Sequence, residues 1–189
     1  MKKILVLSIC LFFAGYYAQS QNFGVKAGLN LSTLAGDTEG LKIKPGLHIG
    51  ALAQFELSDM FKLQPELIFS QQGYAVEAID DAKVNMSYLN IPIIAKFYLG
   101  GGGFNIQAGP QIGLLLAAKA KFPGIDDQDV KEQLESFDFG VAVGLGYDIS
   151  NIVIDARFIP GFTNTSKAAS DADVSDPNQN IQVSVGYTF

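Results

Sequence analysis

Hydrophobic residues alternate with small or polar residues at every second position over most of this chain. In the segment FDFGVAVGLGYDI, residues 137–149, every odd position is apolar and the even positions carry Asp, Gly or Ala. This period of two is typical of a β-strand with two different faces, because successive side chains point to opposite sides. The pattern recurs in seven further segments, which are residues 23–31, 46–57, 61–69, 88–99, 104–116, 152–158 and 181–189.

Most of these eight segments are nine to thirteen residues long. Strands of globular proteins usually have about five to six residues, whereas a tilted strand needs about 9–11 residues to cross a bilayer. No apolar run after residue 21 approaches the roughly 18 residues of a spanning helix. The lengths therefore favour a transmembrane barrel.

The connections between the segments alternate between long and short, as in outer-membrane barrels. The long connections are residues 33–44, 71–87, 117–136 and 163–180, and the short ones are residues 58–60, 100–103 and 150–151. We predict an all-β fold, an eight-stranded antiparallel transmembrane β-barrel with an up-and-down meander. An even number of strands places both termini on the short-turn side, which is the periplasm in such barrels.

The two faces of the predicted strands differ in chemistry. The apolar face brings aromatic residues to a common height at the periplasmic rim, where aromatic girdles form. These residues are Phe23, Phe55, Phe61, Phe97, Phe104, Tyr147, Tyr187 and Phe189. The opposite face carries charges of both signs, namely Lys26, Lys62, Lys96, Arg157, Glu56, Glu66, Asp138, Asp148 and Asp155. A soluble lipocalin-type barrel is disfavoured because this face cannot form an apolar pocket, and we expect paired charges to plug the narrow lumen.

The N-terminus has the features of a secretory signal peptide. Lys2 and Lys3 precede an apolar run from Ile4 to Ala14, and Ala18 and Ser20 are small residues suited to a cleavage site. We therefore predict a signal peptide over residues 1–20 and a barrel domain over residues 21–189. Cys10 lies within the apolar run, so the exported chain would contain no cysteine and no internal disulfide.

Composition and charge narrow the class of protein further. Hydrophobic residues make up 48% of the 189 positions and charged residues 17%, which argues against a disordered chain. The net charge is −6, and it becomes −8 without Lys2 and Lys3, with 11 basic against 19 acidic residues. This sign is wrong for binding phosphates of nucleic acids, so no nucleic-acid partner is expected.

Candidate catalytic and metal-binding residues are few. The single histidine, His48, lies on the inward face, and Glu66 and several serines could complete a hydrolase triad only if the site faced lipid or the rim. We expect His48 to belong to a polar network in the lumen instead. Asp126, Asp127 and Asp129 lie close together but lack the spacing of an EF-hand, so a solvated loop is favoured over a calcium site. We predict no enzyme activity, no cofactor and no metal.

Four segments carry a resemblance to a known family. FGVKAGLNLSTL, SYLNIPIIAKFYL with IQAGPQIGLLL, DFGVAVGLGYDI and IQVSVGYTF resemble the PorT-like outer-membrane β-barrel domain proteins. The resemblance covers about Asn22 to Phe189 and implies the barrel fold and the outer membrane, but little about activity. One branch of that family is associated with a secretion apparatus.

We therefore expect a small barrel of the outer membrane, exported by its signal peptide, with a structural, adhesive or interaction role through its external loops. The alternative is a narrow pore or an accessory subunit of an export complex. The expected partners are outer-membrane lipid, an envelope protein of unknown identity, and the barrel insertion machinery. A terminal strand that ends in an aromatic residue, here Phe189, resembles the signal that this machinery recognises.

Overall fold

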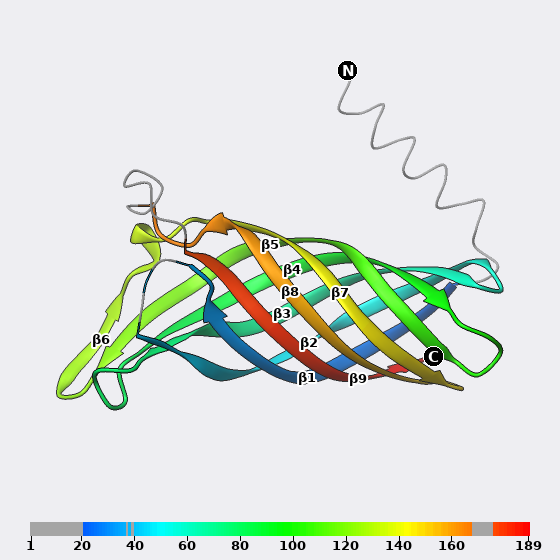
Figure 1. Ribbon diagram of the computed structural model, residues 1–189, viewed down its shortest axis with the longest axis horizontal. Coiled ribbons are helices and arrows are strands. Elements are labelled where there is room, and N and C mark those ends of the chain that lie inside the picture. Colours follow the sequence, from blue (N-terminus) through cyan, green and yellow to red (C-terminus); the bar gives the residue numbers. More distant parts are fainter. Residues whose placement is uncertain (1–20, 37, 39, 168–175) are drawn as a thin grey trace, which may run out of the picture.

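The computed structural model describes residues 21–36, 38, 40–167 and 176–189, and the predicted signal peptide lies outside these residues. Eight long strands wind around a common axis and form a barrel (Figure 1). They are β1 (Gln21–Leu34), β2 (Leu41–Ser58), β3 (Phe61–Val76), β4 (Lys83–Tyr98), β5 (Phe104–Phe122), β7 (Phe137–Ile149), β8 (Ile152–Asn164) and β9 (Pro177–Thr188). The connection from β5 to β7 contains a short strand, β6 (Ile125–Asp129), and a 3₁₀-helix, η1 (Lys131–Gln133).

The barrel is closed and antiparallel throughout. Each long strand pairs with its neighbour in the chain, and β1 pairs with β9 along a register that includes Gly28 with Ser184. The strand β6 pairs with β5 beyond the end of β7 and takes no part in the closure. The predicted eight-stranded meander is confirmed. None of the helices in the described segments is long and apolar enough to cross a membrane.

The strands extend further than the alternation of the sequence predicts. β5 has 19 residues and β2 has 18, and Lys44, inside the connection predicted over residues 33–44, pairs with Ser32. The loop predicted over 71–87 shrinks in the same way to residues 77–82, and the one predicted over 163–180 is wrong at both ends, because β8 extends to Asn164 and β9 begins at Pro177. The predicted loop boundaries are wrong because backbone pairing continues after the apolar side chains end, where hydropathy no longer distinguishes the two faces.

The predicted faces agree with the exposure of the side chains. Leu29 is 59% exposed on the outer wall, whereas its neighbour Asn30 is 0% exposed in the lumen. A wall of exposed leucine, isoleucine, valine and phenylalanine surrounds a polar interior, which is the reverse of a soluble barrel. Such an outer surface is stable only against lipid, and barrel closure leaves no unpaired strand edge within it.

The predicted aromatic girdle forms at the end of the barrel that carries the short turns. Phe61 pairs with Phe97, and Phe104 pairs with Tyr147, so these rings share one height on neighbouring strands. The rings of Tyr187 and Phe189 lie 5.8 Å apart in an edge-on arrangement. Gln21 and Phe189 both lie at this end, which we term the short-turn end, and the opposite end is the long-loop end.

Candidate functional site

Four charged side chains from three parts of the barrel meet in the middle of the lumen. Arg157 on β8 donates two hydrogen bonds to the Glu66 carboxylate on β3, at 2.8 and 2.9 Å. Lys26 on β1 lies 2.9 Å from Asp155 and 3.5 Å from Glu66. Each of the four side chains is at most 1% exposed. Two cations and two carboxylates therefore neutralise one another across the lumen, which offsets much of the cost of burying them. We call these residues the central ion cluster.

Amide side chains connect the central ion cluster to the strands around it. Gln107 accepts a hydrogen bond from the Arg157 Nε atom at 2.7 Å, and Gln64 donates one to Glu66 at 2.6 Å. Gln54 in turn donates to Gln64 at 2.7 Å. These bonds give Arg157 and Glu66 further hydrogen-bond partners and help to fix their geometry.

Small residues of β7 make room for this network. A Cβ atom added at Gly144 would lie 2.9 Å from the Arg157 Cγ atom, and one added at Gly146 would overlap the side-chain amide of Gln107. The alternation of glycine with large outward residues on β7 therefore has a steric cause. The space beside these glycines is filled by side chains from the neighbouring strands β5 and β8.

A second ion pair lies in the lumen toward the short-turn end. The Lys96 ammonium contacts both oxygens of Asp148, at 2.8 and 2.9 Å, and the Tyr98 hydroxyl donates to the same carboxylate at 2.5 Å. Lys62 and Glu56 form a further pair at the rim, at 2.5 Å. The predicted pairing of inward charges is thus observed for most of them. Asp138 differs, because it accepts from Asn178 at 3.2 Å and has no cation within ion-pair distance in the described residues.

His48 lies in a polar network, as the sequence suggests. One ring nitrogen lies 2.9 Å from the Ser184 hydroxyl and the other lies 2.9 Å from the Asn30 side-chain oxygen. Glu66, the sequence candidate for a triad, belongs to the central ion cluster instead. The Ser184 hydroxyl, the His48 ring and the Asn30 amide lie in sequence, an arrangement that also occurs where a histidine acts as the base of a serine nucleophile. However, Ser184 and His48 are only 1% and 3% exposed, so the hydroxyl is not open to a substrate.

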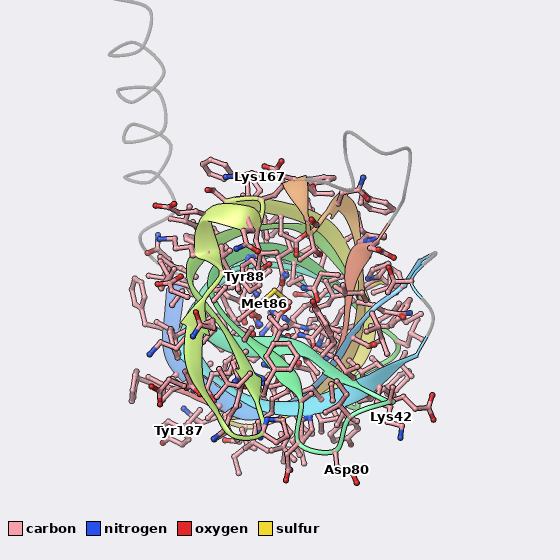
Figure 2. All side chains as sticks on the ribbon, turned by 90° about the vertical axis from the view of Figure 1, so that its left-hand side faces the viewer. Lys42, Asp80, Met86, Tyr88, Lys167 and Tyr187 are labelled. Atoms are coloured by element: carbon pink, nitrogen blue, oxygen red, sulfur yellow. The ribbon has the colours of Figure 1, made fainter. Side chains whose placement is uncertain are left out.

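An apolar plug that the sequence reasoning missed fills the lumen at the long-loop end. It consists of Val84, Met86, Tyr88, Leu115, Ala118, Ala120 and Leu134. Figure 2, a view into this end, shows Met86 and Tyr88 near the centre of the barrel. A detectable signal existed, since Val84, Met86 and Tyr88 have the same parity as the inward residues Asn90 and Lys96. The apolar character of Val84 and Met86 breaks the alternation, so the sequence pattern predicts a loop over residues 71–87 in place of a strand.

The surface of the long-loop end carries acids and isolated apolar residues. The hairpin formed by β5 and β6 projects past the barrel rim (Figure 1), and Asp126, Asp127 and Asp129 lie exposed on β6. Ile125 at its tip is 62% exposed. In the part of the chain that the structure describes, no group of three or more His, Cys, Asp or Glu residues is arranged to hold a metal ion.

Comparisons with known proteins agree with this architecture. The family model described as outer membrane protein beta-barrel domain matches residues 17–167. Among solved structures, Neisserial surface protein A is similar with a TM-score of 0.59 at 15% identity, covering 90% of this chain and 98% of that chain. Ail, the attachment invasion locus protein of Yersinia pestis, crystallised with the heparin analogue sucrose octasulfate, gives a TM-score of 0.53 at 15% identity, covering 90% of this chain and 100% of that chain. No curated protein gives a significant match.

Proposed function

The chain belongs to the outer membrane protein beta-barrel domain family, and from this premise we propose that it is a plugged barrel whose long loops bind a partner protein at the cell surface. The observation that carries the proposal is the contrast between the two parts of the molecule. The lumen is filled by the central ion cluster and the apolar plug, whereas the hairpin of β5 and β6 stands free beyond the rim. We expect a barrel whose lumen is filled to act through its external loops and not as a pore.

This function requires an orientation, which we infer from the connections. The short turns at residues 59–60 and 150–151 suit the periplasmic side, and the longer connections suit the outside. Both described ends of the barrel domain then lie in the periplasm, with the signal peptide of residues 1–20 removed. The aromatic strand ending at Phe189 would be the segment that the insertion machinery binds.

The chemistry of the loops favours a protein partner over an anionic glycan. Ail was crystallised with a heparin analogue, but here the loop tips carry Asp80, Asp81, Asp126 and Asp127. At the tips themselves, these carboxylates repel sulfate groups. The surface pairs these acids with exposed Ile79, Phe122 and Ile125, a combination that fits a partner with basic and apolar side chains.

Two finer statements belong to the same proposal. We assign the chain to the PorT-like group within its family, on the strand segments quoted above. We also propose that the protein has no enzyme activity, because Ser184 and His48 are enclosed within the lumen. Incubation of the folded protein with a fluorophosphonate probe checks the second statement, and labelling of Ser184 would contradict it.

The test of the surface function compares the two ends of the barrel in intact cells. A membrane-impermeant crosslinker is applied to cells that carry the full chain, the tip variant Phe122→Ser with Ile125→Ser, or the control Met60→Ser. Met60 is an exposed apolar residue in a short turn at the other end. We expect a crosslinked adduct that the tip variant loses and the control retains.

Two other outcomes would contradict the surface function. Absence of any adduct for the full chain would exclude a surface partner. The other outcome is a stoichiometric partner that copurifies with the full chain and with the tip variant but not with Met60→Ser. It would place the interaction at the periplasmic end. That result would favour an accessory subunit of an export complex.

A further inference from the structure

A group of three lysines lies on the outer wall of the barrel near the long-loop end. Lys83 on β4 and Lys121 on β5 are direct partners in the strand register, and Lys119 lies two residues before Lys121. Their neighbours Val84, Ala118 and Ala120 are buried in the apolar plug. Since side chains alternate along a strand, the three lysines face away from the lumen, toward the surroundings of the barrel. We call them the wall lysines.

The wall lysines are an unfavourable arrangement for the protein alone. Like charges on directly opposed residues of an antiparallel pair repel each other. Within the described part of the chain, no carboxylate lies within ion-pair distance of Lys83, Lys119 or Lys121. Asp129 faces Lys119 in the register, but its carboxylate accepts a hydrogen bond from the Lys131 amide at 2.9 Å. The charge of the wall lysines is therefore available to an external anion.

The height of the wall lysines matches the headgroup layer of a membrane. The continuous run of outward apolar residues on β5 ends at Leu116 and Ala117, and Lys119 and Lys121 follow two and four residues after Ala117. At about 3.4 Å per residue and a tilt of about 35–45°, they stand about 5 and about 10 Å above the apolar edge. The headgroup region occupies about 5–8 Å on each side of a bilayer, and a lysine side chain can bend toward it.

We propose that the wall lysines form a binding site for a phosphorylated lipid headgroup of the outer leaflet. The site rests on the orientation proposed above, but not on the function of the loops. A phosphate between Lys83 and Lys121 would neutralise the repulsion between them, and the acyl chains of the same lipid would lie against the apolar wall below. Lys119 would contact the headgroup closer to the apolar edge.

Acidic residues beside the site tune its strength. Asp81 and Asp126 line the same hollow of about 540 Å³ as Lys83 and Lys121. Without divalent cations, these carboxylates weaken phosphate binding through repulsion. Removal of Lys83 and Lys121 should therefore weaken retention of the lipid, and removal of the charges of Asp81 and Asp126 should strengthen it. If these four residues only stabilised the fold, the two changes would not have opposite effects.

Native mass spectrometry of the full chain in a nonionic detergent with EDTA tests the site. The probes are bis-phosphorylated lipid A, phosphatidylcholine and inorganic phosphate. We expect lipid A to be retained in preference to phosphatidylcholine, and Lys83→Gln with Lys121→Gln to weaken retention about fivefold for each lysine removed. The variant Asp81→Asn with Asp126→Asn should strengthen it.

The control removes one charge elsewhere on the long-loop end, in Lys167→Gln, and is compared with Lys121→Gln alone. Lys167 lies across the mouth from Asp80 (Figure 2), so this variant should retain lipid A as the unmodified chain does. Heat-modifiable migration on gels confirms that each variant is folded. Three results would overturn the proposal: equal retention of both lipids, an equal loss in the control, or displacement of lipid A by inorganic phosphate, which would indicate an unspecific anion site.

Discussion

At the scale of single residues, the stability of the barrel depends on the balance of charges inside it. The central ion cluster joins residues 91 and 129 positions apart in the chain. Each charge has partners of the opposite sign, so the cluster as a whole is neutral. Removal of one member is therefore far more costly than removal of a neutral pair, because a buried charge would remain without its partner.

The variant Arg157→Ala tests this dependence. It leaves Glu66 with only Lys26 as a cationic partner, at 3.5 Å, and should lower the free energy of unfolding by about 3–5 kcal/mol, less if water enters. The double variant Arg157→Met with Glu66→Leu should cost less than Arg157→Ala, since it removes both charges and keeps the Lys26–Asp155 pair. Urea unfolding followed by circular dichroism measures both, because the chain has no tryptophan for fluorescence. A double variant that is less stable than the single one would contradict the charge-balance account.

A second residue-scale prediction concerns the lipid face. Val143 lies near the middle of β7 and is 44% exposed on the outer wall. Val143→Arg should destabilise the barrel in a bilayer by about 2–4 kcal/mol, because the charge is placed at the bilayer midplane. Val185→Thr, on the same face of β9, should have a mild effect. Equal stabilities of the two variants in lipid vesicles would mean that this face does not contact hydrocarbon.

At the scale of elements, the two terminal strands decide whether the barrel closes. β9 pairs with both β1 and β8, and the Phe189 amide donates to the Phe23 carbonyl at 2.7 Å beyond the last residue of the strand. The Phe189 ring itself is 72% exposed. The ring therefore contributes little to packing inside the barrel, and we propose that it serves recognition during assembly in addition to its place in the aromatic girdle.

Deletion of Phe189 separates these two roles. We expect the truncated chain to refold in detergent almost as well as the full chain, since only one backbone hydrogen bond at the seam is lost. In cells, its level in the outer membrane should fall severalfold, as judged by fractionation. The substitution Phe189→Tyr, which keeps an aromatic ring, should restore that level. A truncated chain that reached the membrane normally would contradict recognition through the last residue.

At the scale of the whole molecule, the distribution of polar and apolar residues is the reverse of that in a soluble globular protein. The largest apolar surface of the barrel faces outward, and its polar groups and ion pairs form the interior. Such a molecule is stable only where lipid covers the wall, and it needs the closed sheet so that each strand finds a partner on both sides. We expect the plug and the two sets of ion pairs to block the lumen.

Membrane association follows directly from the outer wall. Washing of membranes with sodium carbonate should leave the protein in the pellet, and the unheated protein should migrate differently from the heated protein on a gel. Both results reflect a closed barrel that resists detergent until heat unfolds it. Release into the soluble fraction would contradict the lipid-facing wall.

Closure of the lumen is the second prediction at this scale. Planar-bilayer recordings of the refolded protein should show no steady conductance steps, because the central ion cluster and the apolar plug block the interior in series. The double variant Met86→Gly with Tyr88→Gly, which empties part of the plug, should still be closed by the central ion cluster. Reproducible steps in the unmodified protein would promote the pore alternative.

The amino-acid sequence by itself determined the number of long strands, the outward and inward faces, the positions of the short turns and the charged content of the lumen. These features are local, because a strand in contact with lipid must alternate regardless of what its neighbours do. The aromatic girdle followed for the same reason, since short turns place neighbouring strand ends at the same height.

Only the tertiary structure decided which inward groups meet. Arg157 reaches Glu66, and His48 reaches Ser184, because tilt and register bring distant strands together across the lumen. The structure was also needed to find the apolar plug, β6 and the strand ends at the long-loop end. Beyond the outward apolar residues, the two faces of a strand no longer differ in a regular way. The wall lysines became a site only when pairing placed Lys83 beside Lys121. Contacts across a barrel depend on its closure, which local sequence patterns do not encode.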